Sequence, residues 1–236
     1  CTNRPLIIFA HGGSFIFGSK NNSLAENICE TFAKRGYVTA SINYRLATHN
    51  TVLGTDIFSL GGFNWYYELE NGIKVVYSAF SDAKAAIRYF RKSASENNIY
   101  GIDSDQIWFG GNSAGAVLGP HIAYINSLEE FVSGIDPSGQ DYITELVNAN
   151  GGIEGNSGSP GYSSSVSGLI NLAGAIHNLD WIDANDTTPI VSCHGTEDET
   201  VPDECGTVLN SPTSLTVCGS IAMEQVLSVN NIVNDF

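Results

Sequence analysis

Short apolar runs alternate with amphipathic segments along the 236 residues of this chain. The runs at 6–10, 37–44 and 106–110 are bounded by proline, glycine or polar residues, which is typical of strands buried in a parallel sheet. Two further strand candidates lie at 169–176 and 190–193. Because strands that alternate with helices build a parallel sheet covered on both faces, the pattern predicts a single α/β domain over residues 1–236.

Helices are expected at 23–35, 81–96, 114–127 and 219–234. The segment 81–96 is the clearest of these. Its apolar side chains recur three or four residues apart, and basic side chains occupy the other face. The hydrophobic period therefore changes from strand to helix several times along the chain, as an α/β domain requires.

Two stretches show no such period. Residues 46–80 mix polar and aromatic side chains, and we expect a long insertion over the edge of the sheet where a site would lie. Residues 133–168 are expected to form a Gly/Ser-rich loop, since 151–168 alone holds six glycines and six serines. That loop is either a surface linker or a flap over the site.

The composition excludes several classes of function. The net charge is −15, from 25 acidic and 10 basic residues. Binding to nucleic acid or to an anionic membrane surface depends on Lys and Arg, so both partners are disfavoured. No run of 18 apolar residues occurs, so no membrane span is expected.

The five cysteines indicate where the protein resides. Cys205 and Cys218 flank a short loop and are candidates for a local disulfide, and Cys1 with Cys29 could form a second one. Cys193 lies in an apolar run and is expected to be a buried free thiol. No C-x-x-C pair occurs, so neither a zinc site nor any other metal site is expected. Two disulfides would imply a secreted or periplasmic protein whose signal peptide lies outside this chain.

The segment Gly111-Asn112-Ser113-Ala114-Gly115 follows a predicted strand and precedes a predicted helix. A serine among small residues at such a turn is typical of a nucleophile elbow, which presents Oγ at the carboxyl edge of the sheet. The N-terminus of the following helix favours negative charge that develops beside the serine. A chance Gly/Ser turn is the alternative. We expect Ser113 to be a catalytic nucleophile.

A second motif, His11-Gly12-Gly13-Ser14-Phe15, follows the first predicted strand. Glycines allow backbone N–H groups to point at a substrate oxygen without interference from a Cβ. The expected oxyanion-hole donors are the N–H groups of Gly13 and Ala114, with Ser14 as a further candidate. An ordinary Gly-Gly turn is the alternative, and His11 is expected to brace the loop rather than to act as a base.

The third motif runs from His194 to Pro202, directly after the last predicted strand. A carboxylate at this place can orient a histidine and stabilise its imidazolium form. Asp198 is the expected acid, Glu197 and Asp203 are the alternatives, and a solvated acidic loop is the plainer interpretation.

HGGSF, GNSAG and HGTEDETVP, in this order, resemble the α/β-hydrolase carboxylesterase/lipase superfamily, above all its HGG-type bacterial esterases, over most of residues 4–202. The resemblance implies an α/β-hydrolase fold and a serine esterase that needs no cofactor. It also implies Ser113 as the nucleophile, Asp198 as the acid, and Gly13 with Ala114 around the oxyanion. The third glycine of the family is Ser14 here, which leaves the second donor open.

The histidine is the main departure from the family pattern. All five histidines of this chain precede Asp198, whereas the family's histidine follows the acid, after one further strand beyond a helix like 219–234. We therefore expect a fragment that lacks the family's first strands and last strand. It should be nearly inactive by itself, with the catalytic histidine outside this chain. His177 is the internal candidate.

The expected reaction is two-step acyl transfer from a small-molecule or polymeric ester, with Ser113 as the attacking group. Candidate pocket walls are Phe15, Phe17, Trp65 and Tyr66, for which core packing is the alternative. Two other functions fit the same fold. The missing histidine favours a non-catalytic binding module, and a serine peptidase is the second rival.

Overall fold

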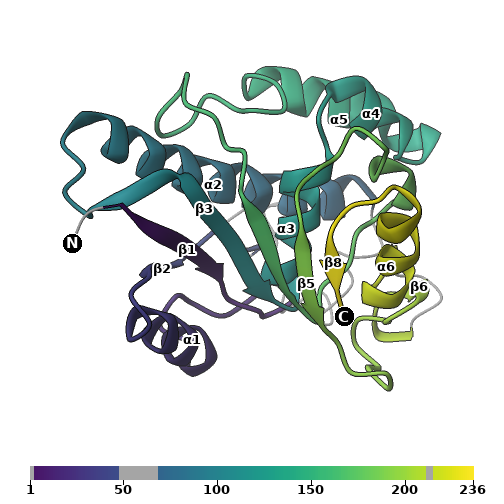
Figure 1. Cartoon of the computed structure of the whole chain (residues 1–236). Helices are drawn as coiled ribbons and strands as arrows, with labels where there is room; N and C mark the ends of the chain where they lie inside the picture. Colours follow the sequence, from purple (N-terminus) through teal and green to yellow (C-terminus); the bar gives the residue numbers. More distant parts are fainter. Residues whose placement is uncertain (1–2, 48–68, 211–214) are drawn as a thin grey trace.

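A six-stranded parallel sheet forms the centre of the protein (Figure 1). The structure is a computed structural model, and it describes residues 3–47, 69–210 and 215–236. The strands of this sheet are β1 (Arg4–Ala10), β2 (Val38–Ile42), β3 (Ile102–Asn112), β4 (Gly168–Leu172), β5 (Ile190–Cys193) and β8 (Asn234–Asp235). Their order across the sheet is β2-β1-β3-β4-β5-β8. A separate antiparallel hairpin pairs β6 (Cys205–Thr207) with β7 (Thr216–Cys218).

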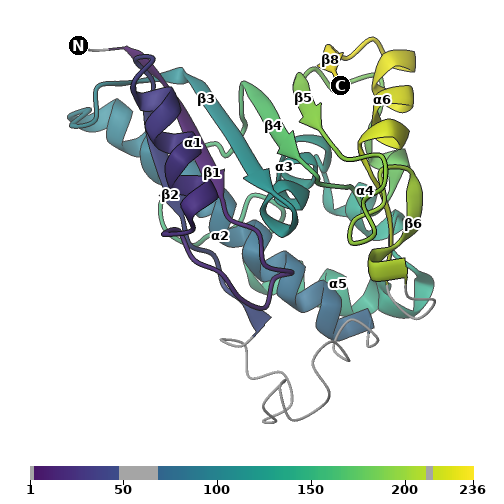
Figure 2. The same ribbon diagram turned by 90° about the horizontal axis from the view of Figure 1, so that it is seen from below.

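Helices cover both faces of the sheet, as the sequence predicts (Figure 2). The helix α1 packs on one face against β1 and β2, whereas α2 and α3 pack on the other face against β3. The helices are α1 (Ser23–Ala33), α2 (Leu69–Glu96), α3 (Ala114–Tyr124), α4 (Leu128–Ser133), α5 (Pro137–Ala149) and α6 (Ser220–Val229), with short 3₁₀ turns at Leu179–Trp181 and Val208–Asn210.

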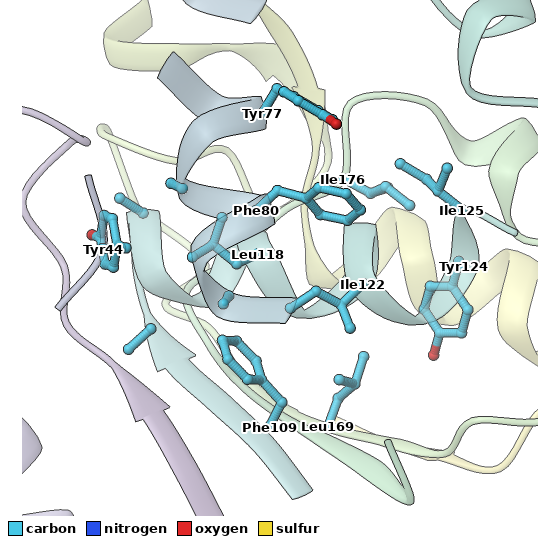
Figure 3. Close-up of a cluster of buried hydrophobic side chains, with 14 of the residues drawn as sticks. Tyr44, Tyr77, Phe80, Phe109, Leu118, Ile122, Tyr124, Ile125, Leu169 and Ile176 are labelled. Carbon is cyan, nitrogen blue, oxygen red and sulfur yellow. The ribbon is translucent and has the colours of Figure 1, made fainter. Parts of the chain in front are cut away.

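The main core lies between α3 and the sheet (Figure 3). Leu118 and Ile122 stand four residues apart on α3, so they share one face of the helix. That face lies over Phe109 of β3 and Leu169 of β4, and all four side chains are buried. Burial of one such side chain contributes about 1.5–3 kcal/mol, so this layer fixes how the helix sits on the sheet.

The helix α2 begins far upstream of the expected position. Residues 69–80, which the sequence analysis assigned to the insertion, are helical. Ile73, Tyr77 and Phe80 are buried at helical spacing and continue the apolar stripe of the rest of the helix. Burial of this apolar stripe stabilises the helix even though polar residues lie between its members. The remainder of the expected insertion, 48–68, lies outside the described residues.

The expected loop at 133–168 also contains a helix, α5. Asp136 caps this helix by accepting a hydrogen bond from the Ser138 N–H, and Pro137 occupies its first turn. Ile143 and Val147 are buried beneath it. A capping residue, a proline at the start and a spacing of four between apolar side chains are helix signals that the Gly/Ser composition farther on had obscured.

The Gly/Ser-rich segment 150–167 folds over basic side chains of α2. Lys84 and Arg88, expected on a solvent face, are almost completely buried there. Lys84 Nζ lies 3.3 Å from Glu154 Oε2, and Arg88 donates hydrogen bonds to the carbonyl oxygens of Glu154 and Ser157. These charge-assisted bonds anchor a segment that has few apolar side chains of its own.

The C-terminal segment differs from expectation as well. The helix α6 ends at Val229, and Asn231 takes a left-handed φ of 59°, which asparagine tolerates. The chain then turns back and forms β8, in which Asn234 pairs with Ile190 of β5. A strand therefore does follow this helix, where the sequence analysis expected none.

Candidate active site

Ser113 occupies the tight turn between β3 and α3. Its backbone has φ 53° and ψ −122°, a combination that a side-chain-bearing residue adopts only under strain. The neighbouring glycines make the turn possible. A Cβ on Gly111 would lie 2.2 Å from the carbonyl carbon of Gly115, and a Cβ on Gly115 would lie 2.3 Å from the oxygen of Ala10. Strand, turn and helix thus have the geometry of a nucleophile elbow.

The loop after β1 lies beside this turn. A Cβ on Gly12 would lie 3.3 Å from Ser113 Cβ, and a Cβ on Gly13 would lie 2.0 Å from the carbonyl oxygen of Phe17. Gly13 has a φ of 123°, and the next two residues also have positive φ. Gly12 therefore lies where this loop approaches Ser113, and Gly13 lies where the loop folds back on itself, and neither place has room for a Cβ.

Two backbone N–H groups next to the Ser113 turn are candidate donors. Within the described residues, the N–H groups of Gly13 and Ala114 make no hydrogen bond. Ala114 is the first residue of α3, so its N–H has no partner within the helix. Ser14 and Ala114 line the same cavity as Ser113. Donors in this position could stabilise an oxyanion that forms next to the serine.

His11 braces the loop that carries Gly13. Its ring stacks on Tyr44 with 4.5 Å between ring centroids, and the Tyr44 hydroxyl donates a 2.7 Å hydrogen bond to the His11 carbonyl oxygen. His11 Nδ1 lies 2.6 Å from the Gly12 carbonyl oxygen. Burial lowers the pKa of this histidine, so it stays neutral in the core. These contacts support a structural role.

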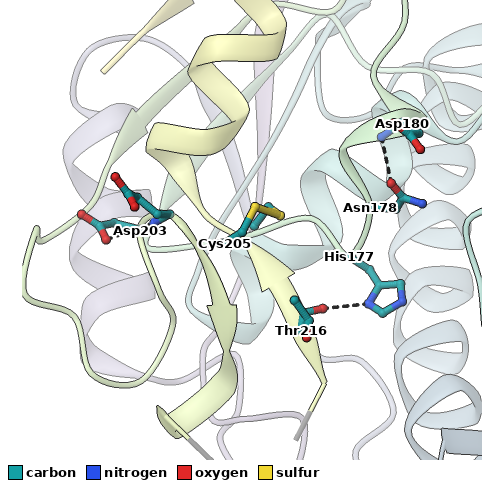
Figure 4. The surroundings of a disulfide bond; sticks show 8 residues. His177, Asn178, Asp180, Asp203, Cys205 and Thr216 are labelled. Atoms are coloured by element: carbon teal, nitrogen blue, oxygen red, sulfur yellow. Dashed lines mark hydrogen bonds between the residues drawn. A yellow bond between two sulfur atoms is a disulfide. The ribbon is translucent and has the colours of Figure 1, made fainter. Parts of the chain in front are cut away.

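Asp198 lies on the loop that follows β5. Its Oδ1 accepts hydrogen bonds from the N–H groups of Thr200 and Val201, at 2.8 and 3.0 Å. Thr200 and Val201 in turn line the cavity that Ser113 lines. The acid loop therefore reaches the region of the serine. Of the alternatives, Glu197 is exposed, and Asp203 Oδ1 accepts a hydrogen bond from the Glu204 N–H beside the hairpin (Figure 4).

None of the described histidines is hydrogen-bonded to Ser113. His194 lies against the acid loop, but its two ring nitrogens contact Ser220 Oγ at 2.9 Å and the Val201 carbonyl oxygen at 3.0 Å. His177 lines the cavity, and its Nδ1 lies 3.0 Å from the Thr216 carbonyl oxygen. His49 lies outside the described residues.

An apolar cavity of about 100 Å³ opens beside Ser113. The sequence analysis expected Phe15 among its walls, and Phe15 does line it. Phe17 does not, since its side chain is 58% exposed. Trp65 and Tyr66 lie outside the described residues. The Gly/Ser-rich segment contributes nothing to the cavity, so the flap interpretation of that segment is not supported.

Most walls of the cavity come from side chains that the sequence analysis did not single out. They belong to four groups: α2, the α3–α4 region, the 3₁₀ turn at Leu179–Trp181 and the hairpin. The helical spacing before Ser81 was the one signal that could have revealed the first group. The residues are Ile73, Val76, Tyr77, Phe80, Val117, His121, Ile125, Phe131, Ile135, Trp181, Val208, Leu215 and Val217.

Two histidines and a tryptophan meet at one wall. The rings of His121 and His177 lie 5.5 and 5.8 Å from the ring of Trp181. Burial lowers the pKa of His121 to about 4 and also lowers the pKa of His177. Both rings are therefore neutral near pH 7, and the wall carries no formal charge.

One of the two expected disulfides is present. Cys205 and Cys218 are bonded, with Cα atoms 4.0 Å apart (Figure 4). Of the second expected pair, Cys1 lies outside the described residues, and Cys29 is a free thiol, so the structure does not support that bond. Burial raises the pKa of the Cys29 thiol, so it stays protonated near neutral pH. Cys193 is free as expected, but it is exposed rather than buried.

The described residues provide no cluster of three or more His, Cys, Asp or Glu side chains that could hold a metal ion. Among the described helices, none combines the length and the apolar sequence that crossing a bilayer requires.

Comparisons with known proteins agree with this architecture. The family model described as BD-FAE matches residues 1–55. No curated protein matches the chain. Among solved structures, the apo form of Thermogutta terrifontis esterase 2 is 20% identical with a TM-score of 0.65, over 99% of this chain and 71% of that one.

A truncated carbohydrate esterase from gut microbiota is 18% identical with a TM-score of 0.63, over 100% of this chain and 77% of that one. Identities this low establish a shared architecture rather than a shared activity. With its mainly parallel sheet, its helices on both faces and its strand–Ser113–helix turn, the chain has the α/β-hydrolase fold.

Proposed function

We propose that the protein is a serine hydrolase that cleaves carboxylic esters of short acyl groups by a Ser–His–Asp mechanism. The observation that carries the proposal is the backbone of Ser113. A serine with φ 53° stands on a strand–helix turn, beside a glycine loop and at the mouth of an apolar cavity. Strain of this kind persists where the surrounding structure maintains it for a functional purpose.

In the first step, Ser113 Oγ attacks the ester carbonyl carbon while a histidine removes the hydroxyl proton. The carbonyl oxygen becomes an oxyanion, which the N–H groups of Gly13 and Ala114 stabilise. When the tetrahedral intermediate collapses, the histidine returns the proton to the leaving alcohol. The acyl group then remains bonded to Ser113.

In the second step, water attacks the acyl-enzyme and the same histidine removes its proton. Collapse releases the carboxylic acid, and Ser113 recovers its hydroxyl proton. Asp198 orients the histidine and stabilises its imidazolium form. We assign the histidine to a position outside the described residues, and by analogy with the family we expect it to follow the strand after α6, which is β8. No cofactor enters either step.

The size of the cavity supports a short acyl group. A protein cavity of about 150 Å³ accommodates benzene, so about 100 Å³ leaves room for roughly four carbon atoms. Structures of Thermogutta terrifontis esterase 2 are described as propionate-bound and butyrate-bound. Those acids have three and four carbons, which is the range that the cavity volume suggests for this protein.

The disulfide between Cys205 and Cys218 supports a secreted or periplasmic protein, because such bonds persist in oxidising compartments. Alkylation of thiols before and after reduction, followed by mass measurement on protein from its natural compartment, tests this. Protein whose Cys205 and Cys218 are alkylated without prior reduction would contradict it.

Covalent labelling tests the proposed nucleophile independently of the ester. The T. terrifontis esterase is described as phosphorylated by paraoxon. We expect paraoxon to phosphorylate Ser113 in the full-length protein, because Oγ attacks phosphorus and p-nitrophenolate leaves. Peptide mapping should find the label on Ser113 and lose it in Ser113→Ala. Ser23→Ala, which removes an exposed serine hydroxyl on α1, should be labelled as the parent is. A label that persists in Ser113→Ala would overturn the proposal.

A non-catalytic binding module is the second candidate. It is favoured by the absence of a hydrogen bond between Ser113 and any described histidine. If the full-length protein binds p-nitrophenyl butyrate but neither hydrolyses it nor reacts with paraoxon, this second function replaces the first.

A further inference from the structure

The hairpin of β6 and β7 is attached to the site at three points. It begins directly after the acid loop, and Cys205 is paired with and bonded to Cys218 directly across the hairpin. At its base, Cys218 and Ile176 exchange backbone hydrogen bonds of 2.8 and 2.9 Å. Next to it, the Leu209 N–H donates to the carbonyl oxygen of Thr200 on the acid loop. The backbone of the hairpin is therefore fixed relative to Asp198.

The inner face of the hairpin closes one side of the cavity. Val208, Leu215 and Val217 line the cavity together with Ser113. Val217 is buried, and it packs with Val201 of the acid loop in a small second core. Thr216 lies between two of these positions, and its carbonyl oxygen is 3.0 Å from His177 Nδ1 (Figure 4). The hairpin thus presents aliphatic side chains to the cavity and a backbone carbonyl to the neutral histidine.

Leu215 reaches across to the start of α2. A Cβ on Gly72 would lie 3.4 Å from Leu215 Cδ1, and both residues line the cavity. Among the described residues outside the backbone of α2 itself, Leu215 alone comes within 4 Å of that position. Leu215 and Gly72 therefore meet where the hairpin and α2 both line the cavity.

We propose that the disulfide-bonded hairpin is the specificity-determining wall of the acyl pocket, and that Leu215, facing Gly72, sets the longest acyl chain that fits. The substrate class rests on the proposed esterase function. The acyl group is the portion concerned because it stays bonded to Ser113 between the two steps, so the cavity that Ser113 lines must hold it. The aliphatic walls select an uncharged, straight aliphatic chain, since an unpaired charge would lose its hydration there.

The test compares kcat/KM for p-nitrophenyl acetate, butyrate, hexanoate and octanoate in the full-length protein. Truncation of Leu215 removes three carbon atoms from the wall of the cavity. Each additional buried methylene contributes about fourfold to binding. We therefore expect Leu215→Ala to raise the ratio of hexanoate to butyrate turnover by at least about fourfold, with little change for acetate.

Gly72→Ala should act in the opposite direction and lower the hexanoate-to-butyrate ratio. This variant is expected to fold as the parent does, because alanine favours a helix more than glycine does, so a changed ratio would not reflect unfolding. The matched control is Leu209→Ala, which removes a leucine side chain that is 41% exposed next to the hairpin and does not line the cavity. Its ratio should equal that of the parent. Equal ratios in Leu215→Ala, Gly72→Ala and the control would overturn the proposal.

A binding arm separates this proposal from the proposed activity. In Ser113→Ala the esters stay intact, and a nitrophenyl group close to the site should quench the fluorescence of Trp181, measured with Trp65 and Trp108 changed to Phe. Dissociation constants that shift with chain length in Leu215→Ala support the hairpin assignment even if the parent hydrolyses nothing. Hydrolysis by the parent, combined with dissociation constants that Leu215→Ala leaves unchanged, overturns the assignment and leaves the esterase function standing.

Discussion

His194 Nε2 lies 3.6 Å from Asp198 Oδ2, although this histidine is not hydrogen-bonded to Ser113. The His194 side chain is completely buried, and each ring nitrogen already has a partner, Ser220 Oγ or the Val201 carbonyl oxygen. Ser220 Oγ also accepts a hydrogen bond from Asn171 Nδ2 of β4. A buried polar chain therefore connects the sheet, the start of α6 and the acid loop. His194 therefore holds the acid loop at the Val201 carbonyl oxygen, three residues from Asp198.

Removing His194 should loosen the acid loop. We expect His194→Ala to lower the free energy of unfolding by about 1–3 kcal/mol, since it leaves buried partners without a hydrogen bond. It should also lower kcat more than it raises KM, because the acid acts on the transition state. Urea titration and steady-state kinetics on the full-length protein measure the two effects. His194→Gln, which can restore one hydrogen bond, should recover part of both losses; a variant with parental stability and kcat would show that His194 does not position the acid.

The strained backbone of Ser113 predicts opposite effects of substitution on stability and on activity. Ser113→Gly should raise the free energy of unfolding by about 1 kcal/mol, because glycine adopts φ 53° and ψ −122° without strain. Turnover should fall by about 10⁶, as for loss of the nucleophile of a triad. Thermal unfolding and p-nitrophenyl butyrate assays check both. A destabilised Ser113→Gly protein would mean that the turn is not strained by its side chain.

The buried histidine of the cavity predicts a dependence of stability on pH. The pKa of His121 falls from 6.5 to about 4 in the folded state, so the unfolded chain binds the proton more tightly. Stability from this source is complete above pH 6.5 and is lost as the pH falls toward 4, by up to about 3 kcal/mol. The lowered pKa of His177 acts in the same direction. Urea unfolding at several pH values should show this slope in the parent and a shallower one in His121→Gln. Equal slopes in the two proteins would exclude His121 as its source.

The disulfide should stabilise the fold. Cys205 and Cys218 are 13 residues apart, and closing a loop of that size contributes about 3 kcal/mol in the chain-entropy description. Denaturant titration of Cys205→Ser should therefore show a loss of about 2–3 kcal/mol. The control is Cys193→Ser, which changes an exposed free thiol and should leave the unfolding midpoint within about 0.5 kcal/mol of the parent. An identical midpoint for Cys205→Ser would show that the hairpin keeps its structure without the bond.

The parallel sheet was predictable because each strand has its own local signal. Residues 6–10 and 107–109 are continuous apolar runs, and glycines follow at 12 and 110. Such runs are typical of strands in the middle of a sheet that is covered on both faces. The turn at Ser113 was predictable for the same reason. Its two glycines are required by contacts within a few residues of the serine and with the adjacent strand.

Other elements depend on contacts between distant parts of the chain. In the sequence, the start of α2 has no clear helical period, and it becomes helical because Ile73 and Tyr77 pack in the core. Likewise, Lys84 and Arg88 occupy the polar face of the helix in sequence, but the loop that carries Glu154 buries them. The structure does not support the expected bond to Cys29, because nearness in sequence is only a weak guide to pairing, whereas Cys205 and Cys218 are directly opposed in a hairpin.

The sequence by itself carried the signals on which the proposed chemistry rests: a glycine loop, a serine between glycines after a strand, and an acidic loop, in that order. Only the tertiary structure decided what surrounds that serine. Leu215 and Gly72 are 143 positions apart in the numbering, and neither belongs to a recognisable motif. They meet because the sheet brings the hairpin and α2 to the same cavity, and aliphatic packing of this kind leaves no periodic or local signal in the sequence.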